Sequence, residues 1–291
     1  MELTWLVQPS DEQIADVAGL LAAAAICDGV DPLSEAAVLR QRSPGTGMHL
    51  LAHHPGGTLV GYAGLDDRAE RRTAEFVVHP EHRRGGIGGA LLAALLERVD
   101  GPLRVWAHGE HPAALRLAQR TGLIRERELW QLRRRLADPI PPRALPSGVT
   151  LRSFVPGTDE AAVVRVNNRA FSWHPEQSRW GVCELALREA QPWFDPKGFL
   201  LAVDPQDRLL GFHWTKVHPD GSGEVYVLGI DPDAQGTGLG GALTAAGLEH
   251  LREQGVAEVM LYVESDNAAA LRTYRKLGFA HHHTDVEFLR R

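Results

Sequence analysis

The sequence predicts an α/β protein in which two copies of one fold follow each other, each a mixed, mostly antiparallel sheet flanked by helices. The first observation is a glycine-rich turn that occurs twice, as VVHPEHRRGGIGGALLAALLERV at 77–99 and as GIDPDAQGTGLGGALTAAGLEHL at 229–251. Aligned on Pro80 and Pro232, the two segments match without a gap. Self-similarity of this length indicates that one structural unit has been repeated.

The second observation is that the agreement continues downstream of the turns. Residues 103–123, LRVWAHGEHPAALRLAQRTGL, resemble residues 259–279, VMLYVESDNAAALRTYRKLGF. Each segment predicts a strand, a short loop and a helix. Each helix is followed by a glycine, Gly122 or Gly278, which suits the left-handed residue that commonly ends a helix.

The third observation is the order of periodic segments, a meander of strands that continues as strand, helix, strand, helix. This order predicts a mixed sheet with helices on its faces. The proline-rich stretch ADPIPPRALPSGVT at 137–150 predicts a semi-rigid linker. We therefore expect an N-terminal domain over 1–137, a linker over 138–149 and a C-terminal domain over 150–291. In the C-terminal domain we predict strands at 149–154, 199–204, 208–218, 223–230, 258–263 and 285–289, and helices at 159–171, 179–190, 238–253 and 267–276.

Composition limits the classes of protein that this chain can belong to. Of the 291 residues, 44% are apolar and 23% are charged, as in soluble globular proteins. No apolar run approaches the ~20 residues that cross a bilayer. The net charge of −6 argues against general nucleic-acid binding. The first residues show neither a basic segment nor a cleavage pattern, so we predict no signal peptide and a cytoplasmic location.

The cysteines and histidines of the chain do not have the spacing of a disulfide framework or a metal site. Cys27 and Cys183 stand alone, which fits a reducing compartment and predicts small, buried or half-buried side chains. Among the 14 histidines, His281–His283 are predicted at a turn into the last strand and His53–His54 at a strand end. Neither group has a ligand spacing such as HExxH, so we predict no metal.

The glycine turn has the composition of a phosphate-binding loop, of which several types are known. A Walker loop is excluded because no Gly-Lys-Ser/Thr follows. The dinucleotide pattern GxGxxG is present at Gly236, Gly238 and Gly241. In the first copy, a pattern that begins at Gly86 has Leu91 in place of the third glycine, so this pattern is not repeated. Both copies share one pattern, in which Gln or Arg is followed by two variable residues and then by Gly-x-Gly. Such glycines expose N–H groups at a helix N-terminus, where the helix dipole also favours an anion such as a pyrophosphate.

The shared pattern, after a strand and at the start of a helix, resembles the acetyl-CoA signature of the GNAT acyltransferase superfamily. The resemblance covers nearly the whole chain as a tandem pair of GNAT domains. It implies that each half binds acetyl-CoA, through the glycine turn and through the free edge of the preceding strand. The residues expected to bind acetyl-CoA are Phe76, Val77, Val78, Arg83, Arg84, Gly85, Gly86, Ile87, Gly88 and Gly89 in the first half, and Leu228, Gly229, Ile230, Gln235, Gly236, Thr237, Gly238, Leu239, Gly240, Gly241, Asn267, Ala268, Ala269, Ala270, Leu271 and Arg272 in the second.

Longer strings resemble the mycothiol synthase family of actinobacteria: RVNNRAFSWHPEQ, GFHWTKVHP, GEVYVLGIDP and LYVESDNAAALRTYRKLGF in the second half, and more loosely DGVDPLSE and VWAHG in the first. That family acetylates the cysteinyl amine of 1D-myo-inositol 2-(L-cysteinylamino)-2-deoxy-α-D-glucopyranoside with acetyl-CoA, giving mycothiol and CoA. The substrate contacts that the resemblance implies are Glu35, Glu176, Lys216, Glu224 and Tyr262.

Comparison of the two copies predicts which half is catalytic. Acetyl transfer to an amine needs a base for the ammonium and an acid for the leaving thiolate. The second half has Glu224 and Tyr274 where the first half has Arg72 and Ala118. We therefore predict Glu224 as general base, through water, and Tyr274 as general acid. The alternation of strand side chains further predicts that Glu224, Tyr226 and Leu228 share one face of the strand.

The first half keeps the glycines of the phosphate site, so we expect it to bind CoA without turnover. Two alternatives stay open. One is a tandem GNAT enzyme that acts on another amine, such as an aminoglycoside or a peptide N-terminus. The other is a non-catalytic acetyl-CoA sensor, against which the presence of Glu224 and Tyr274 speaks. We expect a monomer, because two copies already lie in one chain.

Overall fold

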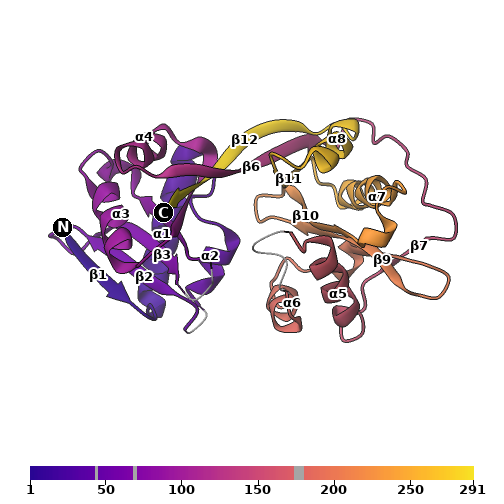
Figure 1. Ribbon diagram of the computed structural model, residues 1–291, viewed down its shortest axis with the longest axis horizontal. Helices are drawn as coiled ribbons and strands as arrows, with labels where there is room; N and C mark the ends of the chain where they lie inside the picture. The colour runs from indigo at the N-terminus through magenta and orange to yellow at the C-terminus, as the bar shows by residue number, and fades with distance from the viewer. Residues whose placement is uncertain (43–44, 68–70, 174–179) are drawn as a thin grey trace. The chain divides into compact units, whose positions relative to one another are not determined.

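The computed structural model describes residues 1–42, 45–67, 71–173 and 180–291. These residues form two compact units, a first unit of residues 1–129 and 283–291 and a second unit of residues 130–282. Both units are sheets covered by helices (Figure 1), which confirms the predicted α/β class with a repeated mixed, mostly antiparallel sheet.

The elements of the first half of the chain alternate between strands and helices. They are β1 (Glu2–Leu6), α1 (Asp11–Asp28), α2 (Glu35–Arg40), β2 (Met48–His53), β3 (Leu59–Asp66), β4 (Thr73–Val78), α3 (Ile87–Arg98), β5 (Leu103–Ala107), α4 (Pro112–Arg120) and β6 (Ile124–Arg135).

The elements of the second half repeat this order. They are β7 (Thr150–Ser153), α5 (Glu160–Ala170), α6 (Val182–Glu189), β8 (Phe199–Val203), β9 (Leu209–Val217), β10 (Gly223–Ile230), α7 (Leu239–Glu253), β11 (Glu258–Glu264), α8 (Ala268–Lys276) and β12 (Ala280–Arg290).

In the first unit the strand order is β1-β2-β3-β4-β5-β12, with β4 and β5 parallel. One face of this sheet packs against α3 through leucines such as Leu91 and Leu95. Val77 of β4 packs with Val17 and Leu20 of α1 instead. Since neighbouring strand residues point to opposite faces, α1 and α3 cover opposite sides of the sheet.

In the second unit the strand order is β6-β11-β10-β9-β8-β7. One core, which includes Trp214 and Phe199, lies beneath α5 and α6, and the other packs Leu248 and Leu251 of α7 against β11. Figure 1 shows α7 and α8 on one side of β9 and β10, and α5 and α6 on the other.

Each unit completes its sheet with a strand from the other half of the sequence. Residues 286–290 of β12 pair antiparallel with 103–107 of β5, inside the first unit. Residues 130–135 of β6 belong to the second unit, where β6 neighbours β11. The compact units therefore differ from the division at residues 138–149 that the repeat suggested, because the last strand of each repeat pairs outside its own half.

Two local predictions are wrong. His281–His283 do not form a turn but lie within β12, because the strand begins at Ala280, five residues earlier than its polar pattern suggested. Cys27 and Cys183 are both exposed, not buried or half-buried. Cys27 lies in the last turn of α1, next to the exposed Ile26.

Helix ends follow the local sequence signals. The Ser10 hydroxyl accepts from the Gln13 amide at 3.2 Å and the Gln13 side chain accepts from the Ser10 amide at 2.9 Å, a reciprocal capping box. Gly122 and Gly278 have φ of 71° and 84°, as predicted for residues that follow a helix. In the described part of the chain, no helix combines the length and the apolar character that a membrane crossing requires.

A buried histidine fixes the position of α7 on the sheet. His213 of β9 is fully buried, and its Nδ1 donates to the Leu243 carbonyl of α7 at 2.8 Å. Burial lowers the pKa of His213 to about 4, so the ring is neutral near pH 7. A Cβ on Gly247 would lie 2.1 Å from Cε1 of His213, so only glycine lets the ring fit here.

We predict that Gly247→Ala lowers the free energy of unfolding by about 1–3 kcal/mol, the usual cost of overpacking a core. The measurement is urea unfolding followed by circular dichroism. Gly19→Ala in α1 is the matched control, because its Cβ would meet nothing within 4 Å and helical alanine is favoured over glycine. Equal stability of the two variants would contradict the packing argument.

Candidate active site

The central parallel strand pair of the second unit separates early. Among the described residues, β10 and β11 are in register at two pairs, Gly223 with Val259 and Glu224 with Met260. Beyond them β10 continues to Ile230, paired on its other side with β9. The backbone groups of residues 228–230 that point toward β11 therefore form a strand edge, to which an extended ligand with amide groups can pair.

The glycine turn stands at the end of this strand edge. Gly238, the residue before α7, has φ of 89°, and Gly236 has φ of 77°, both in the left-handed region that favours glycine. No side chain caps α7, so its first N–H groups are open to an anion. Gln235 donates through Nε2 to the Ile230 carbonyl at 3.2 Å, which ties the turn to the strand.

The turn of the first unit is similar in shape. Gly86 has φ of 86° and precedes α3 without a side-chain cap. Arg83 occupies the place of Gln235 and likewise donates to a strand carbonyl, that of Val78, at 3.2 Å. Its guanidinium also binds both carboxylate oxygens of Asp28 at 2.7 Å. Arg83 thus joins the turn to α1, and Asp28 already uses the donors that were expected to face a phosphate.

A β-bulge distinguishes β10 from its counterpart. The register of β10 with β9 shifts between Val225 and Val227, whereas β3 and β4 pair without interruption. As a result Tyr226 and Val227 both pack toward α5 and α6, and Leu228 packs toward α7. The prediction that Leu228 shares a face with Glu224 is therefore wrong, because the bulge breaks the alternation. Bulges are frequent next to active sites, where they redirect side chains.

Glu224 is a buried carboxylate at the start of β10. Its residue exposure is 7%, and its Oε2 lies 2.8 Å from Nε2 of His218. Lys216 is its partner across the antiparallel ladder and is equally buried. The Lys216 ammonium lies 4.7 Å from the ring centre of Trp193 and 5.1 Å from that of Tyr226. Cation–π contact with these two rings holds the Lys216 ammonium in place.

Tyr274 lies on α8 and is 7% exposed. It packs in the same cluster as Val225, the neighbour of Glu224, and its ring meets Phe279 edge to face. Burial raises the pKa of Tyr274 above its ordinary value, so the phenol stays protonated at neutral pH. A protonated phenol is the form that can act as an acid.

The remaining predicted contacts are less closely grouped. Tyr262 on β11 is 39% exposed, and its hydroxyl accepts from Nε2 of Gln131 at 2.8 Å. Asn267 caps α8, where its side chain accepts from the Ala270 amide at 3.1 Å. Glu35 is the first residue of α2, in the first unit. Glu176 lies outside the described residues.

The first unit has a different set of buried charges on the corresponding face. Glu75 of β4 accepts from the Ser34 amide at 2.6 Å and from the Ser34 hydroxyl at 2.7 Å. His108 lies between two carboxylates, with Nε2 3.0 Å from Glu75 and Nδ1 3.0 Å from Asp285. The Gly109 amide donates to Asp285 at 2.8 Å. We call Ser34, Glu75, His108 and Asp285 the N-unit ion network.

The three ionisable members of the N-unit ion network are all charged. Burial works against the imidazolium of His108, but the hydrogen bonds and charges of Asp285 and Glu75 outweigh it and raise its pKa to about 10. Burial likewise opposes ionisation of Glu75, yet His108 and Ser34 hold the pKa of Glu75 below its ordinary value. His108 is therefore a cation between two anions near pH 7.

The residues predicted as acid and base in the second unit have other residue types at their aligned positions in the first. Arg72, aligned with Glu224, donates to the Asp100 carbonyl, and Ala118, aligned with Tyr274, is a buried methyl group in the core. Neither can take up or deliver a proton near pH 7. The assignment of proton chemistry to the second unit stays a prediction.

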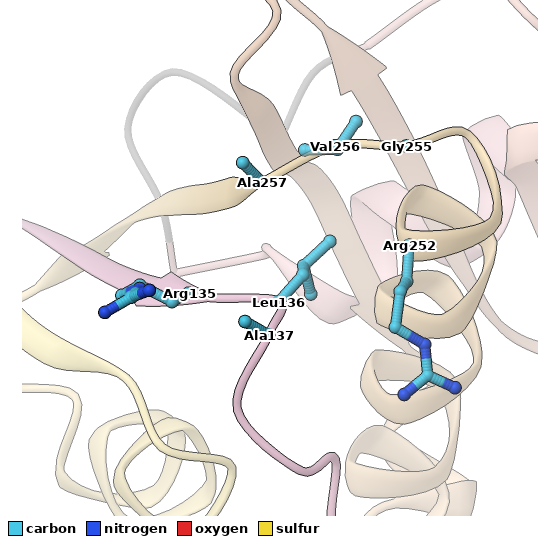
Figure 2. Close-up of a pocket in the computed structure, with 7 residues that line it drawn as sticks. All are labelled: Arg135, Leu136, Ala137, Arg252, Gly255, Val256 and Ala257. Atoms are coloured by element: carbon cyan, nitrogen blue, oxygen red, sulfur yellow. The ribbon is translucent and has the colours of Figure 1, made fainter.

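A cavity of about 470 Å³ lies elsewhere in the second unit (Figure 2). It is lined by the end of β6, by Arg252 of α7 and by residues 255–257, and Arg135 and Arg252 lie on either side of Leu136. Because α7 has 15 residues, this cavity is about 20 Å from the glycine turn at the other helix end. None of the predicted site residues lines it.

Sequence reasoning missed two neighbours of the site. His218 contacts Glu224 because the hairpin after β9 pairs Gly223 with Val217. The turn residues of the string VHPDGSGE are a signal from which this hairpin could have been predicted. Arg188 of α6 donates to the Tyr226 hydroxyl at 2.8 Å, a contact between distant segments for which the sequence holds no signal.

Two family matches cover the two halves of the chain. The family described as Acetyltransferase (GNAT) family matches residues 167–279, and the Acetyltransferase (GNAT) domain matches residues 45–122. A solved tandem GNAT protein from the clavulanic acid biosynthesis pathway has the same fold, with a TM-score of 0.75 over 99% of this chain and 98% of that one, at 21% identity. A GCN5-related N-acetyltransferase from Sphaerobacter thermophilus gives a TM-score of 0.74 at 25% identity, over 99% of this chain and 95% of that one.

Curated relatives are more similar still. A protein of Actinosynnema mirum named Mycothiol acetyltransferase is 53% identical, over 99% of both sequences. A protein of the same name from Saccharopolyspora erythraea is 52% identical, over 90% of this chain and 96% of that protein. Identity of this extent, together with the two GNAT units and the strand edge beside a glycine turn, shows that the chain belongs to the mycothiol acetyltransferase family of tandem GNAT acetyltransferases.

Proposed function

We propose that the protein transfers the acetyl group of acetyl-CoA to the cysteinyl amine of 1D-myo-inositol 2-(L-cysteinylamino)-2-deoxy-α-D-glucopyranoside, which yields mycothiol and CoA. The name of the relatives supports this substrate. The observation that carries the chemistry is the buried carboxylate of Glu224 at the point where β10 and β11 separate.

The residues of the second unit fit acetyl-CoA. The open N–H groups of the glycine turn suit a pyrophosphate, and the edge of residues 228–230 suits the amides of a pantetheine arm. These are the CoA-binding residues expected from the sequence. Gln235 contributes by holding the turn on the strand, because its amide is already bound to Ile230.

Acetyl transfer then needs two proton movements. Glu224, through a water molecule, takes a proton from the substrate ammonium, and the free amine forms a bond to the acetyl carbon. The carbon–sulfur bond breaks, and Tyr274 delivers a proton to the sulfur of CoA. The second proton of the attacking nitrogen then passes to the tyrosinate, which gives the amide and restores the phenol. The raised pKa of Tyr274 keeps this proton available at neutral pH.

The remaining substrate contacts are assigned by resemblance. The substrate carries hydroxyl groups on two rings and an ammonium, so carboxylates and a buried lysine are suitable partners. Lys216 stands beside Glu224 in the ladder. Glu35, Tyr262 and Glu176 complete the proposed set.

We infer that the first unit binds CoA but does not transfer acetyl groups. Its turn has the same left-handed glycine as the second unit. However, the N-unit ion network fills the face on which the second unit presents Glu224 and Lys216, and Arg72 and Ala118 replace the base and the acid. CoA bound there would stabilise the fold without reacting.

We further propose that the protein is a cytoplasmic monomer and that its activity needs no metal.

We predict that Glu224→Gln and Tyr274→Phe each lower kcat/KM for acetyl transfer roughly 100-fold or more, because each removes a proton-transfer group. Product formation from acetyl-CoA and the cysteinyl pseudodisaccharide is followed by mass spectrometry. Glu253→Gln, an exposed change at the end of α7, is the control. Full activity of wild type on other amines and none on the pseudodisaccharide would refute the substrate assignment, and no transfer to any amine would favour a sensor.

We predict different effects for the same change in the two glycine turns. Gly86→Ala and Gly238→Ala both force alanine into a left-handed conformation, at a cost of about 1–2 kcal/mol. Gly238→Ala should raise KM for acetyl-CoA roughly 10-fold, which corresponds to 1.4 kcal/mol. Gly86→Ala should leave transfer unchanged but lower the melting temperature and remove one of two CoA equivalents in calorimetry. Loss of transfer in folded Gly86→Ala contradicts a structural role.

We predict that the N-unit ion network loses stabilising energy in alkali. Folded His108 keeps its proton to about pH 10, against 6.5 for a free histidine, so its contribution is complete below pH 6.5 and is lost as the pH rises toward 10. The free energy of unfolding should fall by up to about 1.4 kcal/mol per pH unit in this window. Urea titrations should show a smaller fall for His108→Gln but not for the exposed His54→Gln. An unchanged slope in His108→Gln would overturn the prediction.

A further inference from the structure

The general base proposed for this enzyme has a histidine partner whose role follows from the geometry. His218 Nε2 lies 2.8 Å from Glu224 Oε2. The side chain of Glu224 is 10% exposed and that of His218 is 20% exposed. His218 therefore stands between a nearly closed carboxylate and solvent.

The backbone holds His218 at this place. The backbone amide of His218 donates to the carbonyl of Ser222 at 2.8 Å, and the carbonyl of His218 accepts from the amide of Gly221 at 2.9 Å. These two backbone hydrogen bonds close the hairpin between β9 and β10 at His218. Gly221 has φ of 83°, a left-handed conformation that this tight turn requires. The histidine is thus positioned by a rigid turn, as an orienting group should be.

The charges around the pair are mixed in sign. Lys216 of β9 is the ladder partner of Glu224, and Asp220 lies in the same turn as His218. Hydrogen bonds from Ser222, with the charges of His218 and Arg133 as smaller contributions, lower the pKa of Asp220. Arg133 of β6 is itself paired with Glu258 of β11 at 2.8 Å. A proton on His218 therefore has two carboxylates, Glu224 and Asp220, in its surroundings.

The proposed reaction leaves a proton on Glu224 after every turnover. A carboxylic acid that keeps this proton cannot serve as base again, and its side chain is largely closed to water. The lone pair of Nε2, in the tautomer that carries hydrogen on Nδ1, is within reach of that proton. A neutral imidazole is the side chain best suited to accept and release a proton near pH 7.

We propose that His218 is a positioning and relay residue: it orients Glu224 and carries the proton from Glu224 to solvent. This inference rests on the proposed role of Glu224. In the relay step the O–H bond of protonated Glu224 breaks and an N–H bond forms at Nε2 of His218. The Nδ1–H bond of the imidazolium then breaks and its proton passes to water, which restores the carboxylate and leaves a neutral histidine with hydrogen on Nε2. Exchange of the ring proton with solvent returns the hydrogen to Nδ1 and frees the Nε2 lone pair for the next turnover.

Two substitutions separate positioning from relay. His218→Gln keeps an amide that can hold Glu224 but cannot carry a proton, whereas His218→Ala removes both functions. We expect kcat to fall roughly 10-fold or more in both, with KM for both substrates changed by no more than about twofold. Added imidazole should restore kcat of His218→Ala, more strongly as the pH rises and neutral imidazole accumulates.

The matched control is His250→Gln. His250 also pairs with a carboxylate in the second unit, Asp195 at 3.5 Å, and its side chain is 16% exposed, but it lies on α7 outside the site. Its kcat should equal that of wild type. Melting temperature and CoA binding, measured for all variants, report whether each one is folded.

A measurement without substrate tests the contact itself. The ring resonances of His218 are compared by NMR at one fixed pH in wild type and in Glu224→Gln. We expect them to shift in the variant, because the substitution changes the group that faces Nε2 of His218 at 2.8 Å. Unchanged resonances would overturn the contact and the proposal with it.

The outcomes distinguish this inference from the proposed function. Full activity of His218→Gln, or no rescue of His218→Ala by imidazole, overturns the relay while Glu224→Gln still loses activity. If Glu224→Gln keeps full activity, the base assignment fails and the relay fails with it. Loss of kcat in both His218 variants, rescue by imidazole and a wild-type His250→Gln together support the relay.

Discussion

The early end of the parallel pairing between β10 and β11 is the constraint on which the site depends. Two register pairs hold the strands together, and the following residues of β10 have a sheet partner on one side only. Unpaired backbone groups are costly unless a partner satisfies them. A ligand with amide groups is such a partner, and the glycine turn that follows the strand receives the charged end of the same ligand. The carboxylate of Glu224 stands at the last paired position, where the strands begin to separate.

The same early separation occurs in the first unit, where β4 and β5 pair at three positions. The two units differ in the side chains on one face of the sheet next to this separation. The second unit has a bulge at Tyr226, and the Lys216 ammonium lies against the ring of this tyrosine. The first unit has a regular strand and fills this face with a cation between two anions. Removing one member would leave a buried charge unpaired, so the network closes that face firmly. Under the proposed function, CoA binding and proton chemistry would be separable properties of one fold.

The sequence was informative where the chemistry is local. The repeat, the left-handed glycines at 236, 238, 122 and 278 and most strands of the second half were predictable, because backbone geometry and alternation leave direct marks on residue choice. The bulge left no mark, so the side predicted for Leu228 was wrong. Arg83 carries the expected charge, yet its partner Asp28 stands 55 residues away and nothing in the spacing reveals it. Partners brought together only by the fold, such as His108 and Asp285, need three-dimensional information.

The exchange of final strands makes the two copies structurally dependent on each other. The sheet of the first unit ends with residues 286–290 from the C-terminus of the chain, and the second unit includes residues 130–135 from the first half. Cutting the chain in the linker at 138–149 would separate the repeats but not the units, because each fragment would lack the strand that completes its sheet. An open sheet edge is an aggregation hazard and a loss of pairing. The first copy is therefore required for a closed catalytic unit, whether or not its own glycine turn holds CoA.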